Sequence, residues 1–408
     1  MATLFLMLIY LTFISLGLPD SLLGAVWPAM RLDLGAGLAW AGGLSMIVSG
    51  GTVVSSLASE RMVERFGAGW VTAVSVFATA GALLGFGLAP SFWWLAVLAV
   101  PLGLGAGAVD AAVNNYVALH YEARHMAWLH SFWGVGTFTG PLVLAAFLRS
   151  DYGWRGGYLA VGCFQAAVSI VLFSSVRLWK RGGPDTGSAS MSRDSIRRDL
   201  PKMPPFKIAG VKYALASFLL YSAVESSAGL WGGSYLAEAR GYDTIWAARG
   251  SAAFFGGITV GRFLGGFLTA HFRGPRLIRY GIVTILAGAV VLALPLPGPA
   301  AFVGMLVVGL GCAPVFPSII HETPRRFGSS NSQKVIGLQM ATAYCGTTFL
   351  PPLLGMVASR TGLWIFPYAL MLFAAVMLAS SEAVTRAVKK DIAERARLGR
   401  RSDSDQPG

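Results

Sequence analysis

Apolar stretches of about 20 residues or more alternate with short polar breaks along almost the whole chain. Each stretch is long enough to cross ~30 Å of hydrocarbon as an α-helix. Strands of a membrane barrel would alternate polar and apolar residues over about 10 positions, and that alternation is absent. The pattern predicts an all-α membrane protein with twelve transmembrane helices, over residues 3–29, 38–59, 69–89, 92–119, 126–148, 157–178, 208–237, 246–271, 276–295, 299–321, 333–358 and 362–386.

The longest polar interruption divides the twelve predicted helices into six and six. It covers residues 179–207 and is rich in Gly, Pro, Ser, Arg and Lys, which predicts a cytoplasmic linker rather than a span. We therefore expect an N-terminal six-helix half over 1–178 and a pseudo-symmetric C-terminal half over 208–390. The charged segment 391–408 is expected to be a disordered cytoplasmic tail.

The charged residues predict how the chain is oriented in the membrane. The chain is 55% hydrophobic and 12% charged, whereas soluble domains carry about 25% charged residues. Lys and Arg concentrate in cytoplasmic loops, and their distribution predicts two cytoplasmic termini in a multi-pass protein of the inner membrane. A basic linker and tail facing an anionic leaflet also account for the net charge of +13 without nucleic acid. The arginines left in the outer loops are Arg31, Arg149, Arg155, Arg240, Arg249 and Arg360.

Three acidic residues lie deep within the predicted spans. Asp20 lies in the first, Asp110 in the fourth and Glu225 in the seventh. A carboxylate in hydrocarbon costs at least ~2.5–3.5 kcal/mol on insertion scales, so such residues usually face a cavity and carry ions or protons. Burial favours the neutral form of a carboxyl group, so the same group can be neutral in one state and charged in another. Asp110 and Glu225 are therefore predicted to couple transport to protons, and Glu225 is also a candidate substrate contact.

One face of the fourth span carries small and polar residues at helical spacing, namely Gly103, Gly107, Asp110 and Asn114. Small residues let that face approach a neighbouring helix or line a cavity. Asn114 and the adjacent Asn115 offer amides that both donate and accept hydrogen bonds, which suits a polyhydroxylated substrate. An interhelical hydrogen bond is the alternative, and the sequence leaves both open.

Further side chains at mid-span depth are candidate substrate contacts: Trp27, Trp133, Tyr221 and Gln339. Trp27 lies seven residues after Asp20 and therefore on its face. Aromatic rings can stack on the apolar face of a sugar, and Gln339 can bond a hydroxyl group; core packing is the alternative for each ring. Arg262 is the one basic residue deep in a predicted span. It either pairs with an acidic residue as a gate or anchors neighbouring helices.

The loop between the second and third spans reads Glu60-Arg-Met-Val-Glu-Arg-Phe-Gly67. It resembles the Gly-x-x-x-Asp-Arg-x-Gly signature of the major facilitator superfamily, with Glu64 and Arg65 in the acidic and basic positions. The equivalent segment after the eighth span, 261–274, has Ala-His in those positions. The resemblance implies the major facilitator fold, in which two halves rock around a midplane site. Glu64, Arg65 and Arg262 are then expected to be gating residues.

The fourth span also resembles a narrower family. Its run Gly103-Leu-Gly-Ala-Gly-Ala-Val-Asp-Ala-Ala-Val-Asn-Asn-Tyr-Val117 is similar to the fourth helix of the fucose–galactose–glucose:proton symporter family, which has a Gly-rich run, an acidic residue, and an Asn four residues on. The resemblance implies that Asp110 couples protons and that Asp20 contacts substrate. Weaker likenesses to the same family occur at residues 19–24, 129–136, 221–225 and 309–317. In the second of these segments His130 and Trp133 replace the family's Gln and Asn.

The sequence therefore predicts a monomeric secondary transporter that imports a monosaccharide or similar polyol together with a proton. Sodium is the second option for the coupling ion, and no cofactor is expected. A proton-driven exporter of drugs or metabolites is the alternative; its pocket would be apolar, and its acidic residues would compete for a cation. A sensor or scaffold that binds a ligand without transporting it is disfavoured by the short linker.

The chain lacks the sequence motifs of ATP-driven transporters, metal-binding proteins and enzymes. There is no Gly-x-x-x-x-Gly-Lys-Ser/Thr loop for ATP. Cys163, Cys312 and Cys345 have no metal-like spacing and imply no disulfide framework. No set of catalytic or metal-binding side chains converges at one depth, so the chain is not expected to be an enzyme.

Overall fold

The computed structural model describes residues 2–121, 123–180, 203–272, 274–296 and 299–404. Within these residues the chain forms thirteen α-helices and no strand, which confirms the predicted all-α fold. The central part of the expected linker, 181–202, and the last residues of the expected tail, 405–408, lie outside the described residues.

Six long helices form an N-terminal bundle. Gly67, with a φ of 82°, lets the chain reverse between the second and third of them in a conformation that favours glycine. A 3₁₀ turn, η1 (Val176–Lys180), follows the sixth. The helices are α1 (Ala2–Asp33), α2 (Trp40–Phe66), α3 (Ala68–Gly87), α4 (Phe92–His120), α5 (Ala123–Phe147) and α6 (Gly153–Ser175).

Seven helices form the C-terminal bundle, after a 3₁₀ turn, η2 (Pro205–Lys207). A π-helical turn, η3 (Tyr235–Ala239), extends the first of them, and a 3₁₀ turn, η4 (Leu363–Ile365), precedes the last. The helices are α7 (Val211–Ser234), α8 (Thr244–His271), α9 (Gly274–Ala293), α10 (Ala300–Cys312), α11 (Val315–Phe327), α12 (Ser329–Thr361) and α13 (Phe366–Ser404).

The thirteenth helix arises because the tenth expected span, 299–321, is broken. α10 ends at Cys312 and α11 begins at Val315, with Ala313 and Pro314 between them. Proline has no N–H for the i→i−4 hydrogen bond and its ring clashes with the preceding turn. The proline therefore divides this span into two short helices, of which the second continues to Phe327.

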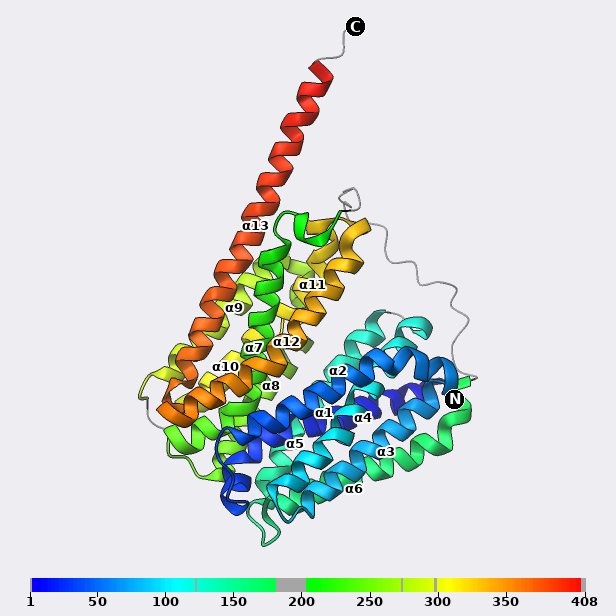
Figure 1. Cartoon of the computed structure of the whole chain (residues 1–408), viewed down its shortest axis with the longest axis vertical. Coiled ribbons are helices and arrows are strands. Elements are labelled where there is room, and N and C mark those ends of the chain that lie inside the picture. The colour runs from blue at the N-terminus through cyan, green and yellow to red at the C-terminus, as the bar shows by residue number, and fades with distance from the viewer. Residues whose placement is uncertain (1, 122, 181–202, 273, 297–298, 405–408) are drawn as a thin grey trace.

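The C-terminal tail differs from the expected disorder. α13 continues to Ser404 and extends beyond the rest of its bundle as a straight helix (Figure 1). Lys390 and Glu394 form an ion pair at i,i+4 spacing, with 3.8 Å between Nζ and Oε1. Such pairs support a helix, and eight of the fourteen residues 391–404 are Ala, Leu, Arg or Glu, which are strong helix formers.

Eight helical stretches of the described residues are long and apolar enough to cross a membrane, and one of them runs through α10 and α11 together. α5, α7, α8 and α12 are not among the eight. These four helices supply polar side chains to the cavity described below.

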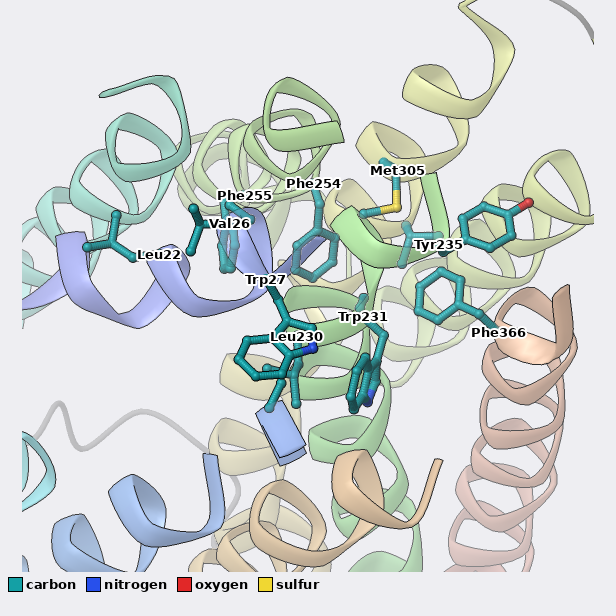
Figure 2. Close-up of a cluster of buried hydrophobic side chains, with 14 of the residues drawn as sticks. Leu22, Val26, Trp27, Leu230, Trp231, Tyr235, Phe254, Phe255, Met305 and Phe366 are labelled. Atoms are coloured by element: carbon teal, nitrogen blue, oxygen red, sulfur yellow. The ribbon is translucent and has the colours of Figure 1, made fainter. Parts of the chain in front are cut away.

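The two bundles are in contact at one end and diverge toward the other (Figure 1). The contact joins α1 to α7 and α8, α5 to α8, and α2 to α12. We call the end where α1 joins α2 and α7 joins α8 the closed end, and the opposite end the open end. At the closed end the core is continuous between the bundles: Leu22, Val26 and Trp27 of α1 gather with Leu230 and Trp231 of α7 (Figure 2).

Candidate functional site

A cavity of about 1050 Å³ lies between the two bundles. This volume is at the upper end of the ~300–1,000 Å³ typical of small-molecule sites. Along α5, wall residues run from Trp128 to Trp133, whereas the next residue, Gly134, accepts a hydrogen bond from Thr259 of α8, 2.8 Å away. The cavity therefore begins where contact between the bundles ends, and it lies toward the open end.

Asp20 faces this cavity from α1 and is held by a residue of α5. The indole Nε1 of Trp133 donates a hydrogen bond to Asp20 Oδ2 at 2.8 Å. Both residues belong to the cavity wall. A hydrogen bond to a carboxylate is stronger than one between neutral groups, so the contact fixes the orientation of both side chains.

Arg262 links the same tryptophan to the C-terminal bundle. The carbon at the centre of its guanidinium lies 4.8 Å from the ring centroid of Trp133, a geometry in which the ring attracts the cation. Its Nη2 lies 3.3 Å from Glu225 Oε1. Asp20, Trp133, Arg262 and Glu225 thus form a continuous chain of contacts from α1 through α5 and α8 to α7. Arg262 therefore pairs with an acidic residue of its own bundle, and both of its expected roles, gate and helix anchor, stay predictions.

Asp110 faces the cavity from α4. Asn114 donates from Nδ2 to Asp110 Oδ1 at 2.9 Å and is not itself a wall residue. Its amide therefore bonds within its own helix, which is neither of the two alternatives that the sequence left open. The side chain of Asn115 lies outside the described residues.

The glycines of α4 serve contact with α2. A Cβ on Gly103 would lie 2.2 Å from the Val48 carbonyl oxygen, and one on Gly107 would lie 2.2 Å from that of Thr52. Both distances are far shorter than a van der Waals contact, so only glycine fits. The sequence left two uses open for this small-residue face, and close approach to a neighbouring helix is the one observed. Asp110 of the same helix lines the cavity wall.

Three predicted substrate contacts lie away from the cavity wall. Trp27 is fully buried and donates from Nε1 to the Leu38 carbonyl at 3.0 Å. Tyr221 is buried against Phe218, with 6.2 Å between ring centroids. Gln339 is buried and accepts a hydrogen bond from Thr323 at 3.0 Å. The expectation that these side chains face the cavity is wrong for this conformation, because neighbouring helices of the bundles cover them.

The predicted gating pair of the signature loop lies at the open end. Glu64 and Arg65 are exposed in the last turn of α2, and the Arg65 guanidinium lies 5.3 Å from the ring centroid of Phe66. The described residues contain no ion pair between this loop and the C-terminal bundle. The side chains of Glu60 and of residues 270–271 lie outside the described ones.

His130 is a wall residue that was not among the predicted substrate contacts. It lines the cavity from α5, and its ring meets Phe13 edge to face at 5.9 Å. Residues three apart share a helix face, so the spacing between His130 and Trp133 was the available signal.

The wall therefore presents three carboxylates, Asp20, Asp110 and Glu225, with Arg262 as the guanidinium. No group of three or more His, Cys, Asp or Glu side chains suited to a metal occurs in the described part of the chain. The carboxylates come from both bundles: Asp20 and Asp110 from the N-terminal one and Glu225 from the C-terminal one.

A family model for the Major Facilitator Superfamily matches residues 9–340. The chain belongs to this superfamily. It is accordingly a multi-pass membrane protein and a secondary transporter rather than an enzyme. The superfamily fold also explains why two bundles meet around one cavity.

Relatives of known sequence and structure agree with this assignment. The chain is 23% identical to "Bypass of stop codon protein 6" of Saccharomyces cerevisiae over 395 residues, covering 87% of this chain and 77% of the yeast protein. It is 24% identical to the "Uncharacterized transporter y4wD" of Sinorhizobium fredii over 346 residues, covering 82% and 86%. The crystal structure of a D-xylose–proton symporter superposes with a TM-score of 0.70 at 14% identity, covering 91% and 96%. At that identity the superposition indicates a shared fold alone.

Proposed function

We propose that this transporter takes up a monosaccharide or a similar polyol together with a proton, by alternating access. The observation that carries the proposal is the cavity wall, where Asp20, Asp110 and Glu225 surround one space with the ring of Trp133. Carboxylates accept hydrogen bonds from hydroxyl groups, and an aromatic ring packs against the apolar face of a sugar. The resemblance of α4 to the fucose–galactose–glucose:proton symporter family supports the same class.

Asp110 is the group to which we assign coupling. In the open state water reaches the cavity wall, and a carboxylate there is hydrated. Occlusion removes that water, and an ionised carboxylate then costs free energy that protonation avoids. The protonated, loaded carrier therefore closes more readily than the unprotonated one. Glu225 takes the same role when Arg262 moves away from it; sodium is the second option for the coupling ion.

The location follows from the distribution of Lys and Arg. We place both termini and the open end on the cytoplasmic side of an inner membrane, because basic residues concentrate on that side. In this orientation the structure corresponds to an inward-open carrier. We further propose that the transporter works as a monomer, since the cavity is built from the two bundles of one chain.

Proton movement in proteoliposomes tests the proposal. The purified transporter is reconstituted with a pH-sensitive dye inside, and monosaccharides and polyols are added outside one at a time. A substrate that acidifies the interior, and does so less with Asp110→Asn, supports sugar–proton symport. Absence of any response across the panel contradicts it.

A proton-driven exporter of apolar solutes is the second candidate, because apolar side chains make up most of the wall. They include Phe13, Leu16, Leu23, Leu44, Val48, Leu83, Phe86, Leu102, Leu230, Phe255, Phe263 and Phe316. Apolar linings suit drug-like solutes. Lipophilic cations belong in the same panel: if they release protons from the vesicles and sugars do not, the exporter is the correct assignment.

A further inference from the structure

The charged side chains around the main cavity do not balance. The wall holds three carboxylates and one guanidinium, that of Arg262. Arg262 already pairs with Glu225, with 3.3 Å between Nη2 and Oε1, so its charge is matched within the C-terminal bundle. His130 is the one further described wall residue that can become a cation. The cavity therefore carries a net negative charge whether the ring of His130 is neutral or protonated.

The two carboxylates of the N-terminal bundle have neutral partners only. Asp20 Oδ2 accepts a hydrogen bond from the indole Nε1 of Trp133 at 2.8 Å. Asp110 Oδ1 accepts one from the amide of Asn114 at 2.9 Å. No ion pair between described residues includes either carboxylate. Asp20 is exposed to the cavity, and its second oxygen, Oδ1, accepts no bond from a described residue. That oxygen is open to an occupant.

The coupling proton can neutralise one of these carboxylates but not both. Asp20 and Asp110 lie close enough for the charge of one to act on the other. Like charges in a space shielded from water repel each other, and an unpaired charge is costly to enclose. When the cavity closes, the proton assigned to Asp110 removes one charge. Asp20 then needs a positive group, which the described wall does not supply.

Two hydroxyl groups in the same wall also lack a partner. Tyr158 of α6 is 2% exposed and Ser318 of α11 is 5% exposed, and both line the cavity. Neither hydroxyl forms a hydrogen bond with another described residue. A buried hydroxyl without a partner costs free energy, so the cavity favours an occupant that brings hydroxyl groups of its own.

We propose that the transported solute is an amino sugar whose primary ammonium group binds Asp20. The assignment rests on the proposed uptake of a sugar or polyol and names the substrate class of that same cavity. The ammonium group donates a hydrogen bond to Asp20 Oδ1 and matches its charge, while Asp110 stays available for the coupling proton.

The open oxygen also determines which kind of cation fits. A primary ammonium group has N–H donors and forms a charge-assisted hydrogen bond with a carboxylate. A quaternary ammonium group has no N–H and offers its charge alone. The hydroxyl groups of the sugar ring distinguish an amino sugar from a purely apolar amine, because they can pair with the unpartnered hydroxyls of the wall.

Calorimetric titration of the purified full-length transporter tests the assignment. Glucosamine, glucose and N-acetylglucosamine share one ring, and at neutral pH most of the glucosamine alone carries a positive charge. We expect glucosamine to bind about tenfold more tightly or more than either neutral sugar, which is the effect of one hydrogen bond to a charged group.

Two variants show whether the preference arises at Asp20. Asp20→Asn keeps an oxygen that can accept the Trp133 bond and removes the charge, so the ratio of the two affinities should fall to about one. Asp151→Asn is the matched control: it makes the same chemical change at an exposed residue of the same bundle, outside the cavity wall. The preference for glucosamine should persist there.

The outcomes separate this assignment from the proposed uptake. Equal binding of the three sugars, or a glucosamine preference that persists in Asp20→Asn, overturns the amino-sugar assignment and leaves sugar uptake standing. Binding of none of them contradicts both. The comparison of sugars on the wild-type protein decides the matter even if Asp20→Asn fails to fold.

Discussion

At the residue scale, Trp133 contributes two different interactions through two parts of one side chain. Its indole N–H bonds Asp20 of the same bundle, and its ring face holds Arg262 of the other bundle. Phenylalanine keeps an aromatic face and removes the donor. This residue therefore offers a way to separate the hydrogen bond from the cation–π contact.

Trp133→Phe is expected to lower kcat/KM for uptake about tenfold or more. The reason is that a hydrogen bond to a charged group contributes roughly 1.5–3 kcal/mol, and ~1.4 kcal/mol corresponds to a factor of ten. Initial uptake rates in proteoliposomes give the value. Trp128→Phe makes the same chemical change in the same cavity wall and is expected to have little effect; equal losses in both variants would contradict the role of the Asp20 bond.

Among the cavity residues, the sequence predicted best the charged ones that lie in apolar stretches. Asp20, Asp110 and Glu225 all reach the cavity wall, because a carboxylate is too costly in lipid to lie elsewhere. Trp27 shows why periodicity was a weaker guide. Seven residues place it on the face of Asp20 but ~10 Å further along the axis, beyond Gly24, where α1 already packs against α7.

At the element scale, glycine contacts decide where α1 and α7 meet. A Cβ on Gly24 would lie 2.0 Å from the carbonyl oxygen of Gly229, and one on Gly233 would lie 2.6 Å from that of Gly24. The helices therefore touch backbone to backbone at the closed end. The sequence predicted the helices well because hydrophobic length is a local signal, whereas such pairings depend on which helices become neighbours.

Gly24→Ala is expected to keep the closed end from closing. The added methyl group overlaps backbone atoms of α7 that no side-chain rotation can move, so the bundles separate there. Labels placed on α1 and α7 at the closed end should report a longer distance by electron-spin resonance, and uptake should be lost. Gly43→Ala is the control, since a Cβ on Gly43 has open space around it. An unchanged distance between the labels in Gly24→Ala would show that the contact between α1 and α7 at Gly24 does not hold the closed end shut.

At the scale of the whole molecule, the described ion pairs divide into those within a bundle and one between bundles. Arg31 joins the bundles at the closed end, with Nε and Nη2 each 2.8 Å from Glu238 Oε1. Arg155 pairs with Asp33 at the same end, but inside the N-terminal bundle. A rocking motion that opens the closed end must break the first pair and leaves the second intact.

Arg31→Gln is expected to raise the population of the state that is open at the closed end by up to about fivefold. Partly exposed ion pairs contribute roughly 0.2–1 kcal/mol, which sets this upper limit. The same distance measurement across the closed end reports the population. Arg155→Gln removes an ion pair that lies at the same end but inside the N-terminal bundle, so it should leave the distribution of distances unchanged. A similar change in the distances of both variants would argue against a bundle-joining role for Arg31.

The central claim is that Asp110 couples proton movement to solute uptake, and one comparison tests it most directly. Uphill accumulation driven by a pH gradient and exchange of solute at equilibrium are measured side by side in proteoliposomes carrying wild type or Asp110→Asn. We predict that the variant loses uphill accumulation and retains exchange, because a permanently neutral group lets the carrier close but carries no proton. Uphill accumulation that survives in Asp110→Asn would contradict the account.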